Sequence, residues 1–372
     1  MNAAATNPTN PLRRVHALGQ SLWLDDIRRG WLRDGHLARL ISDDAVAGVT
    51  SNPAIFAKSI SEGAEYNEGI STLAKAGRSI NDIYETLALE DVQAAADLFR
   101  QTFTATNGAD GFVSLEVSPH LADDTKGTIE EGLRLWKAFD RPNAMIKVPG
   151  TAAGLPAITE LIAAGININV TLLFSVERYK AVVDAYLAGL EQRVKAGKPI
   201  DKIASVASFF LSRIDTLIDP KLDAMKTPEA KARRGRAAIA SARLAYQHYK
   251  QWTSSPRWQA LASKGVKPQR LLWASTSSKD PAYKDTMYVE ALIAPNTVNT
   301  LPPATVDAYR DHGDPAVRIE DDVAEARETV QFLSSVGIDL NVVSEQLERE
   351  GVKKFKEPFD ALLATLKARA GK

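Results

Sequence analysis

One lysine lies inside a short apolar segment, where a charged side chain is unusual. Lys147 follows Met145 and Ile146 and precedes Val148 and Pro149. Lysine is rarely buried without a partner or a function. A neutral lysine amine can attack a carbonyl and form a Schiff base, and an apolar pocket favours the neutral form of the amine. The alternative is a lysine at the mouth of a strand that pairs with a carboxylate, and position alone leaves both interpretations open.

Two carboxylates are candidates for the proton transfers that imine chemistry requires. Glu116 lies within the apolar segment Gly111–Val117, and Asp25 ends the segment Ser21–Asp25. Imine formation and aldol cleavage both need a group close to the amine that takes up and returns protons. A carboxylate in a dry pocket beside an uncharged lysine can itself have a raised pKa. We therefore expect Glu116 and Asp25 to act as acid–base groups around Lys147.

Polar side chains recur where the apolar segments end. Asn167, Asn169 and Thr171 alternate with apolar residues, so they are expected to share one face of a strand. Polar groups that face a barrel interior are costly unless they bind something or are fully hydrogen-bonded. A single buried Asn is more often a structural anchor, but several converging polar strand ends favour a binding site. The other such residues are Thr50, Ser51, Asn52, Ser205, Ser208, Ser275, Thr276 and Ser277.

The elements that must position these side chains alternate along the chain. Eight short segments, several nearly continuous in apolar residues, are each followed by a helical stretch such as Asn81–Phe103 or Val176–Ala196. This pattern is typical of parallel strands buried on both faces. It predicts an α/β protein with a closed (β/α)8 TIM barrel and an active site at the carboxyl ends of the strands. The predicted strands are Ser21–Asp25, Gly48–Thr50, Gly111–Val117, Ala144–Val148, Gly165–Leu173, Ile203–Phe209, Arg270–Ala274 and Thr297–Leu301.

Three segments fall outside this minimal barrel. Thr216–Gln269 is predicted to be a helical insertion between the sixth and seventh strands, which covers the barrel, forms an interface or is a plain elaboration. Apolar residues at helical spacing in Ile338–Lys372 predict C-terminal closing helices. Residues 1–12 are rich in Asn, Thr and Pro and predict a disordered lead. The remaining residues, 13–372, are expected to form a single barrel domain.

Composition narrows the class of protein. The chain has 372 residues, of which 46 are Lys or Arg and 46 are Asp or Glu, so its formal net charge is zero. This balance gives no support to nucleic-acid binding. The chain has no cysteine, which excludes disulfides and thiolate chemistry. No apolar run approaches the roughly 18 residues that span a bilayer, and no secretory signal pattern opens the chain, so we expect a cytoplasmic protein without a membrane partner.

Motifs for other chemistries are missing from the sequence. The glycines of Gly150–Gly154 do not have the spacing of a dinucleotide-binding loop, and there is no nucleophile elbow of the Gly-x-Ser-x-Gly type. Dinucleotide binding and a Ser–His–Asp hydrolase, like a metal site, therefore have no support in the sequence. The histidines, which show no metal-ligand spacing, are His16, His36, His120, His248 and His312.

Three segments resemble the signatures of transaldolases: Val49–Pro53 (VTSNP), Ile146–Thr151 (IKVPGT) and Ile166–Ser175 (ININVTLLFS). The similarity runs from about residue 15 to the C-terminus, and Trp273–Pro281 (WASTSSKDP) is similar to the longer bacterial subfamily. The resemblance implies a class I aldolase-type transferase of the non-oxidative pentose phosphate pathway that uses neither metal nor organic cofactor. Such enzymes move a dihydroxyacetone unit from sedoheptulose 7-phosphate or fructose 6-phosphate to glyceraldehyde 3-phosphate or erythrose 4-phosphate.

The resemblance also implies a role for each strand-end residue. Lys147 would form the imine with C2 of the donor. Glu116 and Thr171 would handle the catalytic water, and Asp25 would take the proton of the C4 hydroxyl as the C3–C4 bond breaks. The hydroxyls of the donor would be held by Asn52, Asn169 and Ser208.

The phosphate site departs from the shorter family members. Arg213 matches one phosphate-binding arginine, but Ser277 replaces the second, which is expected two residues after Ser275. We expect Ser275, Ser277 and Lys279 to complete the site, although a lysine is a point charge rather than a fork. Small sugar phosphates are thus the expected partners. Whether the chain is a monomer or a homodimer is left open.

Two other functions are compatible with parts of this pattern. Fructose 6-phosphate aldolases, which release free dihydroxyacetone, share the barrel and the lysine. Phe210 favours the transferase, because an apolar ring cannot hold the hydrolytic water, whereas the related aldolases carry a Tyr there. A catalytically silent sugar-phosphate-binding protein is the second alternative. The presence of every proposed catalytic side chain disfavours it.

Overall fold

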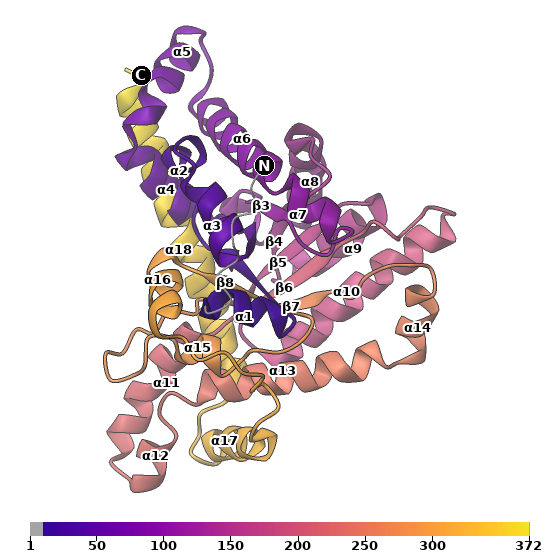
Figure 1. Cartoon of the computed structure of the whole chain (residues 1–372), viewed down its shortest axis with the longest axis vertical. Helices are drawn as coiled ribbons and strands as arrows, with labels where there is room; N and C mark the ends of the chain where they lie inside the picture. The colour runs from indigo at the N-terminus through magenta and orange to yellow at the C-terminus, as the bar shows by residue number, and fades with distance from the viewer. Residues whose placement is uncertain (1–9, 372) are drawn as a thin grey trace.

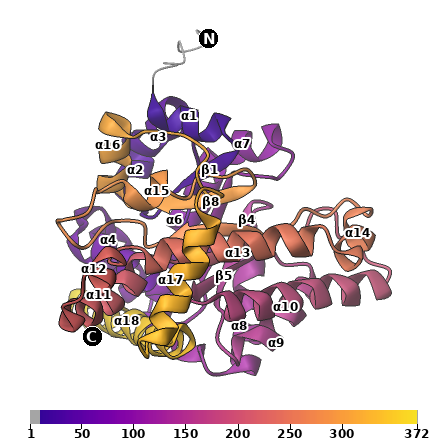
Figure 2. The ribbon, with the colours of Figure 1, turned by 90° about the horizontal axis from the view of Figure 1, so that it is seen from below.

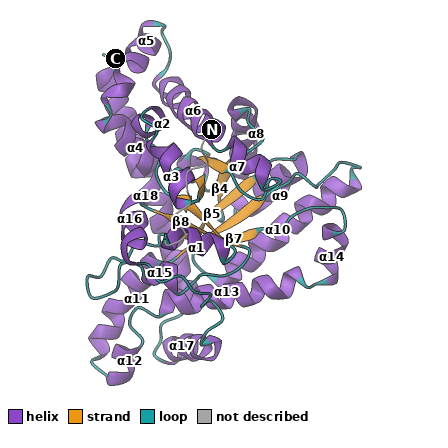
Figure 3. Cartoon of the chain, viewed as in Figure 1, coloured by secondary structure: helices purple, strands orange, loops and turns teal. Residues whose placement is uncertain are grey.

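Eight parallel strands close into a barrel at the centre of the computed structural model, which describes residues 10–371 (Figure 3). Each strand pairs with the next along the chain, and the first pairs with the last, so the sheet has no free edge. The predicted TIM barrel is therefore confirmed. The strands are β1 Gln20–Leu24, β2 Val46–Val49, β3 Phe112–Glu116, β4 Ala144–Pro149, β5 Ile168–Leu173, β6 Ser205–Phe210, β7 Arg270–Ala274 and β8 Thr297–Leu301.

The predicted bounds of β7 and β8 are confirmed, whereas those of β5 were too wide at the amino end. Gly165 ends the preceding helix in a left-handed conformation with φ 100°, so the strand cannot begin there. At its other end β5 contains an irregularity, where the pairing with β6 shifts between Val170 and Leu173. Leu172 has φ 63°, which is rare for a residue with a side chain. Bulges of this kind often lie beside active sites, and this one directly follows Thr171.

Helices surround the barrel (Figure 1). The predicted helix Asn81–Phe103 is two helices in the structure, whereas Val176–Ala196 is one, capped by Ser175. Up to β6 the helices and 3-10 turns are α1 Pro11–Ala17, α2 Arg29–Arg33, α3 His36–Asp44, α4 Pro53–Glu62, η1 Ala64–Tyr66, α5 Asn67–Lys75, α6 Ile80–Leu98, α7 Arg100–Ala105, η2 Pro119–Leu121, α8 Thr125–Phe139, α9 Gly154–Ala164 and α10 Val176–Lys195.

The insertion between β6 and β7 is helical, as predicted, and begins earlier, at Ser212. Its long third helix packs against α10 and against a later helix, α17, which crosses it in Figure 2. The helices of the insertion are α11 Ser212–Met225, α12 Pro228–Ala232, α13 Ala237–Thr253 and α14 Pro256–Ala262. Those that follow β7 are α15 Met287–Glu290, α16 Pro303–His312, α17 Val323–Ser335 and α18 Leu340–Arg369.

The C-terminal tail forms one 30-residue helix, α18, rather than the several closing helices that were predicted. It packs along α4 and reaches β5 and α11 (yellow in Figure 1). Gly351 makes this approach possible, because a Cβ there would lie 2.9 Å from Cδ2 of Leu172. One turn further along the helix, Phe355 is brought over the carboxyl end of the barrel.

Residues 10–12, which were predicted to belong to a disordered lead, cap or form the first helix. Residues 1–9 lie outside the described residues, but Asn10 caps α1 and donates a hydrogen bond to Asp44. Residues 11 and 12 are already helical.

Among residues 10–371, no helix is both long enough and apolar enough to cross a membrane.

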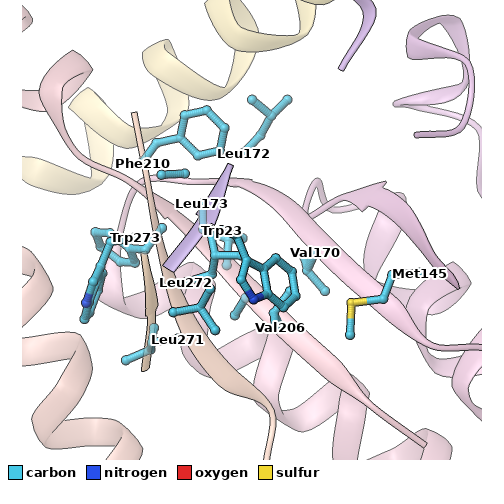
Figure 4. Packing of buried hydrophobic residues seen from close by; sticks show 14 of the residues in the cluster. Trp23, Met145, Val170, Leu172, Leu173, Val206, Phe210, Leu271, Leu272 and Trp273 are labelled. Carbon is cyan, nitrogen blue, oxygen red and sulfur yellow. The ribbon is translucent and has the colours of Figure 1, made fainter. Parts of the chain in front are cut away.

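The interior of the barrel is filled by side chains from several strands. Figure 4 shows Trp23 of β1, Met145 of β4 and Val206 of β6 within one buried apolar cluster. At the amino end of the barrel, Arg270 pairs with the buried Asp110 at 3.0 Å. The Nε1 of Trp23 also donates to this carboxylate, at 3.0 Å. The amino end is therefore packed and internally paired, and the chemistry is expected at the carboxyl mouth.

Candidate active site

Lys147 lies on β4 with its side chain inside the barrel, only 4% exposed. Its Nζ is 3.2 Å from Oε2 of Glu116 and donates a hydrogen bond of 3.1 Å to the main-chain oxygen of Ser51. The ring of Phe355 lies 5.6 Å away. The two interpretations of this lysine are thus compatible, because the carboxylate that pairs with the amine is also placed to take a proton from it.

Glu116 is the residue directly opposite Lys147 on the neighbouring strand. Burial raises the pKa of its carboxyl group to about 7, and the charge of Lys147 only partly offsets this effect. A carboxyl group with this pKa can both give and accept a proton near neutral pH. Its Oε1 is buried without a hydrogen-bond partner, and so is Oγ1 of Thr171. Two unpaired buried oxygens in one site are what a bound water or a substrate hydroxyl would satisfy.

Asp25 follows the last residue of β1 at the mouth of the barrel. Its Oδ1 accepts a hydrogen bond of 2.8 Å from Thr50, whose hydroxyl lies 2.7 Å from that of Thr300. Burial raises its pKa, whereas the charge of Lys147 lowers it. The adjacent Asp26 instead pairs with Arg28 at 2.7 Å. Of the two consecutive aspartates, Asp25 is therefore the one placed to exchange protons near Lys147.

Asn169 and Ser208 form a hydrogen-bonded chain on the wall of the barrel. The hydroxyl of Ser208 donates to Oδ1 of Asn169 at 2.7 Å, and Nδ2 of Asn169 donates to the hydroxyl of Ser114 at 3.0 Å. Asn52 has a local role as well, because its Oδ1 accepts from the main-chain nitrogen of Ile55 and caps α4. These contacts fix the side-chain orientations before a ligand arrives, which reduces the entropy lost on binding.

The residues expected to bind phosphate meet on the side of the mouth formed by β6 and β7. Arg213 is the second residue of α11, and its Nη1 is buried without a hydrogen-bond partner. Lys279 donates to the hydroxyl of Ser277 at 2.6 Å. Burial lowers the pKa of Lys279, and the charge of Arg213 lowers it further. The positive charges of Arg213 and Lys279 repel each other, so an anion bound between them would be stabilised.

A cavity of about 180 Å³ joins these groups. Of the eleven residues predicted from the sequence, nine line it directly. Glu116 reaches the cavity through Lys147, and Asn169 through Ser208. The nine are Asp25, Asn52, Lys147, Thr171, Ser208, Arg213, Ser275, Ser277 and Lys279.

The chain is similar to known enzymes over nearly its whole length. Residues 22–366 match the family model described as transaldolase/fructose-6-phosphate aldolase. The chain belongs to this family. It is 53% identical to the transaldolase of Saccharopolyspora erythraea over 357 residues, which cover 96% of each chain. It is 48% identical to the transaldolase of Frankia alni over 365 residues, or 98% of each chain, and 51% identical to that of Thermobifida fusca over 95% of this chain and 96% of the relative.

Two strand-end residues of this family member were misplaced by the sequence pattern. Asn167 precedes β5, where its amide donates to the main-chain oxygen of Ala144 and accepts from the nitrogen of Ala204. Ser205 is the first residue of β6 and donates to the oxygen of Ile168. Both therefore lie at the amino end of the barrel, away from the mouth, where they hold neighbouring strands together.

Several cavity residues carried no clear signal in the sequence. Thr300 supports Thr50 behind Asp25, but a threonine in a strand is ordinary. Phe355 covers Lys147 from α18, where it looked like one more apolar residue of an amphipathic helix. Among residues 10–371, no group of His, Cys, Asp and Glu side chains is arranged to hold a metal ion.

Proposed function

We propose that this chain catalyses transaldol transfer through an imine on Lys147. The chain is then a transferase that moves a dihydroxyacetone unit from sedoheptulose 7-phosphate or fructose 6-phosphate to glyceraldehyde 3-phosphate or erythrose 4-phosphate. This reaction belongs to the non-oxidative pentose phosphate pathway of the cytoplasm. The observation that carries the proposal is the buried Lys147 amine, which lies 3.2 Å from the carboxylate of Glu116. The cavity that Lys147 lines also contains two cationic side chains that can bind a phosphate, Arg213 and Lys279.

In the first step, Nζ of Lys147 adds to the C2 carbonyl of the donor ketose. Glu116 takes one proton from the amino group as it adds to C2, and a second amine proton passes to the carbonyl oxygen. Glu116 then protonates the resulting hydroxyl, which leaves as water, and the C2=N bond that forms keeps the last amine proton. A pKa of about 7 suits both halves of this transfer. Thr171, whose hydroxyl has no other partner, holds the water.

In the second step, Asp25 takes the proton of the C4 hydroxyl. The C3–C4 bond breaks, its electron pair moves into the protonated imine and neutralises its nitrogen, and an enamine remains on Lys147 while the aldose phosphate leaves. The acceptor aldehyde then reverses this step by forming a new C–C bond, and water releases the product ketose. The apolar cover provided by Phe355 and Phe210 keeps the enamine from bulk water between the two aldehydes.

Reduction of the imine tests the proposal directly. Borohydride added with fructose 6-phosphate should leave a stable sugar adduct on the peptide that contains Lys147. Lys147→Met should lose the adduct, whereas Lys180→Met, which removes an exposed lysine of α10, should keep it. A missing adduct on Lys147 in the unmodified protein would overturn the mechanism.

Arg213→Ala is expected to raise the KM for fructose 6-phosphate by about 10- to 100-fold, the effect of losing charge-assisted hydrogen bonds to the phosphate. Steady-state kinetics with erythrose 4-phosphate as acceptor measures this. Arg178→Ala is the matched control, since it removes a half-buried arginine that pairs with Glu348 outside the cavity. An unchanged KM for Arg213→Ala would remove this residue from the phosphate site.

The second candidate is an aldolase that releases dihydroxyacetone. Phe210 lines the cavity beside Arg213, 5.3 Å from its guanidinium carbon. Its apolar ring offers no group to activate water and thus favours transfer. Product partition decides between the two: cleavage of fructose 6-phosphate at a comparable rate without any acceptor would establish the aldolase.

A further inference from the structure

The segment that carries Ser277 and Lys279 has no regular secondary structure. It extends from the end of β7 at Ala274 to the start of α15 at Met287. Its internal bonds are local: Lys279 donates to the hydroxyl of Ser277, and Asp280 accepts from the hydroxyl of Ser278 and from the main-chain nitrogens of Ala282 and Tyr283. A lysine on such a segment loses much conformational freedom when it holds one position, so its use as a binding group requires support from elsewhere.

That support comes from the insertion between β6 and β7. Arg234, between α12 and α13, pairs with Oδ2 of Asp280 at 2.7 Å. The hydroxyl of Tyr283 donates to Oδ2 of Asp219 on α11 at 2.6 Å. Oδ1 of the same aspartate accepts from the main-chain nitrogen of Gly235 at 3.0 Å. The two ends of the 280–283 turn are therefore each tied to the insertion by a charged hydrogen bond.

The contact around Tyr283 is shaped for this ring. Gly235 has φ 67°, and a Cβ at that position would lie 2.8 Å from Cζ of Tyr283. The guanidinium carbon of Arg234 lies 5.8 Å from the centre of the same ring, and its Nε is 3.1 Å from Asp223. A residue with a side chain at position 235 would displace the ring, so glycine permits the close packing.

The helix that receives these bonds also carries the other phosphate-binding cation. Arg213 is the second residue of α11, and Asp219 lies six residues further along the same helix. Lys279 lines the catalytic cavity and also a second cavity of about 280 Å³, whose wall includes Asp219 and Tyr283. One rigid element thus bears Arg213 and holds the segment that bears Lys279.

We propose that the insertion positions Lys279 against Arg213 through the Tyr283–Asp219 and Asp280–Arg234 contacts and so sets the spacing of the phosphate site. Tyr283, Asp219, Arg234 and Asp280 are positioning residues in this scheme, and none of them touches the substrate. The insertion compensates for the missing second arginine of the phosphate site, since a lysine supplies no planar fork to define its own geometry. This inference rests on the proposed role of Lys279 in binding phosphate.

Tyr283→Phe is the test, because it removes one hydroxyl and keeps the ring. We expect the KM for fructose 6-phosphate and the inhibition constant of inorganic phosphate to rise together by about three- to tenfold, with kcat little changed. Asp280→Asn should act in the same direction, since it weakens the pair with Arg234 and keeps an oxygen for the nitrogen of Ala282. In the Lys279→Ala background, Tyr283→Phe should have no further effect on either constant.

The matched control is Tyr186→Phe, which removes a tyrosine hydroxyl that donates to the oxygen of Lys267 at 2.7 Å, outside the cavity. At a comparable loss of melting temperature, this variant should keep both constants at their original values. Equal effects of Tyr283→Phe with and without Lys279 would show that the tyrosine does not act through the lysine. If Lys279→Ala itself changes neither constant, it is the proposed phosphate role that fails. If Lys279→Ala raises both and Tyr283→Phe raises neither, only the positioning role fails.

Discussion

Replacing Asp25 by Asn is expected to lower kcat for transfer by about 10²- to 10⁴-fold, the usual contribution of a general acid or base. The amide cannot accept the proton of the C4 hydroxyl, so the C3–C4 bond breaks slowly. Imine formation depends instead on Lys147 and Glu116, which form their own ion pair at 3.2 Å. Borohydride should therefore still trap fructose 6-phosphate on Lys147 in this variant, now as the adduct of the uncleaved six-carbon sugar.

The neighbouring carboxylate provides a matched control. Asp26→Asn removes the same charge one residue away, but Asp26 pairs with Arg28 and does not line the cavity. It should leave kcat nearly unchanged. A loss of trapping in Asp25→Asn equal to its loss of turnover would mean that Asp25 serves imine formation rather than C–C cleavage. Mass spectrometry of the trapped peptide separates the two cases, because the intact sugar and the three-carbon fragment differ in mass.

The architecture was predictable because buried parallel strands leave a strong local pattern. The segment that became β7 was bounded correctly, since its apolar run ends abruptly at Ser275, and the segment that became β8 was bounded correctly before Pro302. Amino ends were harder to predict. The alternating pattern of β5 begins at Ile166, but the left-handed Gly165 and the hydrogen bonds of Asn167 place the start of the strand at Ile168. A buried Asn that anchors neighbouring strands has the same sequence signal as one that lines a site.

Only those site residues that lie on the strands or at their carboxyl ends could be predicted from the sequence. In a parallel barrel all carboxyl ends meet at one face, so Lys147 and Asp25 could be placed together without knowledge of any contact. The position of Phe355 could not be predicted, because it depends on how α18 crosses the mouth of the barrel. The path of α18 follows in turn from the packing of Gly351 on Leu172. The contacts between the insertion and the segment after β7 could not be predicted for a similar reason, since they join residues more than forty positions apart.

Glu116→Gln is expected to slow imine formation by about 10²- to 10⁴-fold and to change its pH dependence. Glu116 must be a carboxylate to take a proton from the amine. Its carboxyl group is protonated with a pKa of about 7, and in that form it cannot act as the base. The rate for the unmodified enzyme should therefore fall as pH decreases through about 7.

In Glu116→Gln this acid limb near pH 7 should disappear, because glutamine does not titrate. Glu131→Gln is a suitable control. Burial raises the pKa of Glu131 too, but this carboxylate accepts from the nitrogen of Ser118 outside the cavity, so its variant should keep the limb near pH 7. The rate of borohydride trapping, measured across the pH range, gives the pH dependence of both variants. An acid limb that persists in Glu116→Gln would assign that ionisation to another group, and Asp25, whose pKa burial also raises, would be the first to test.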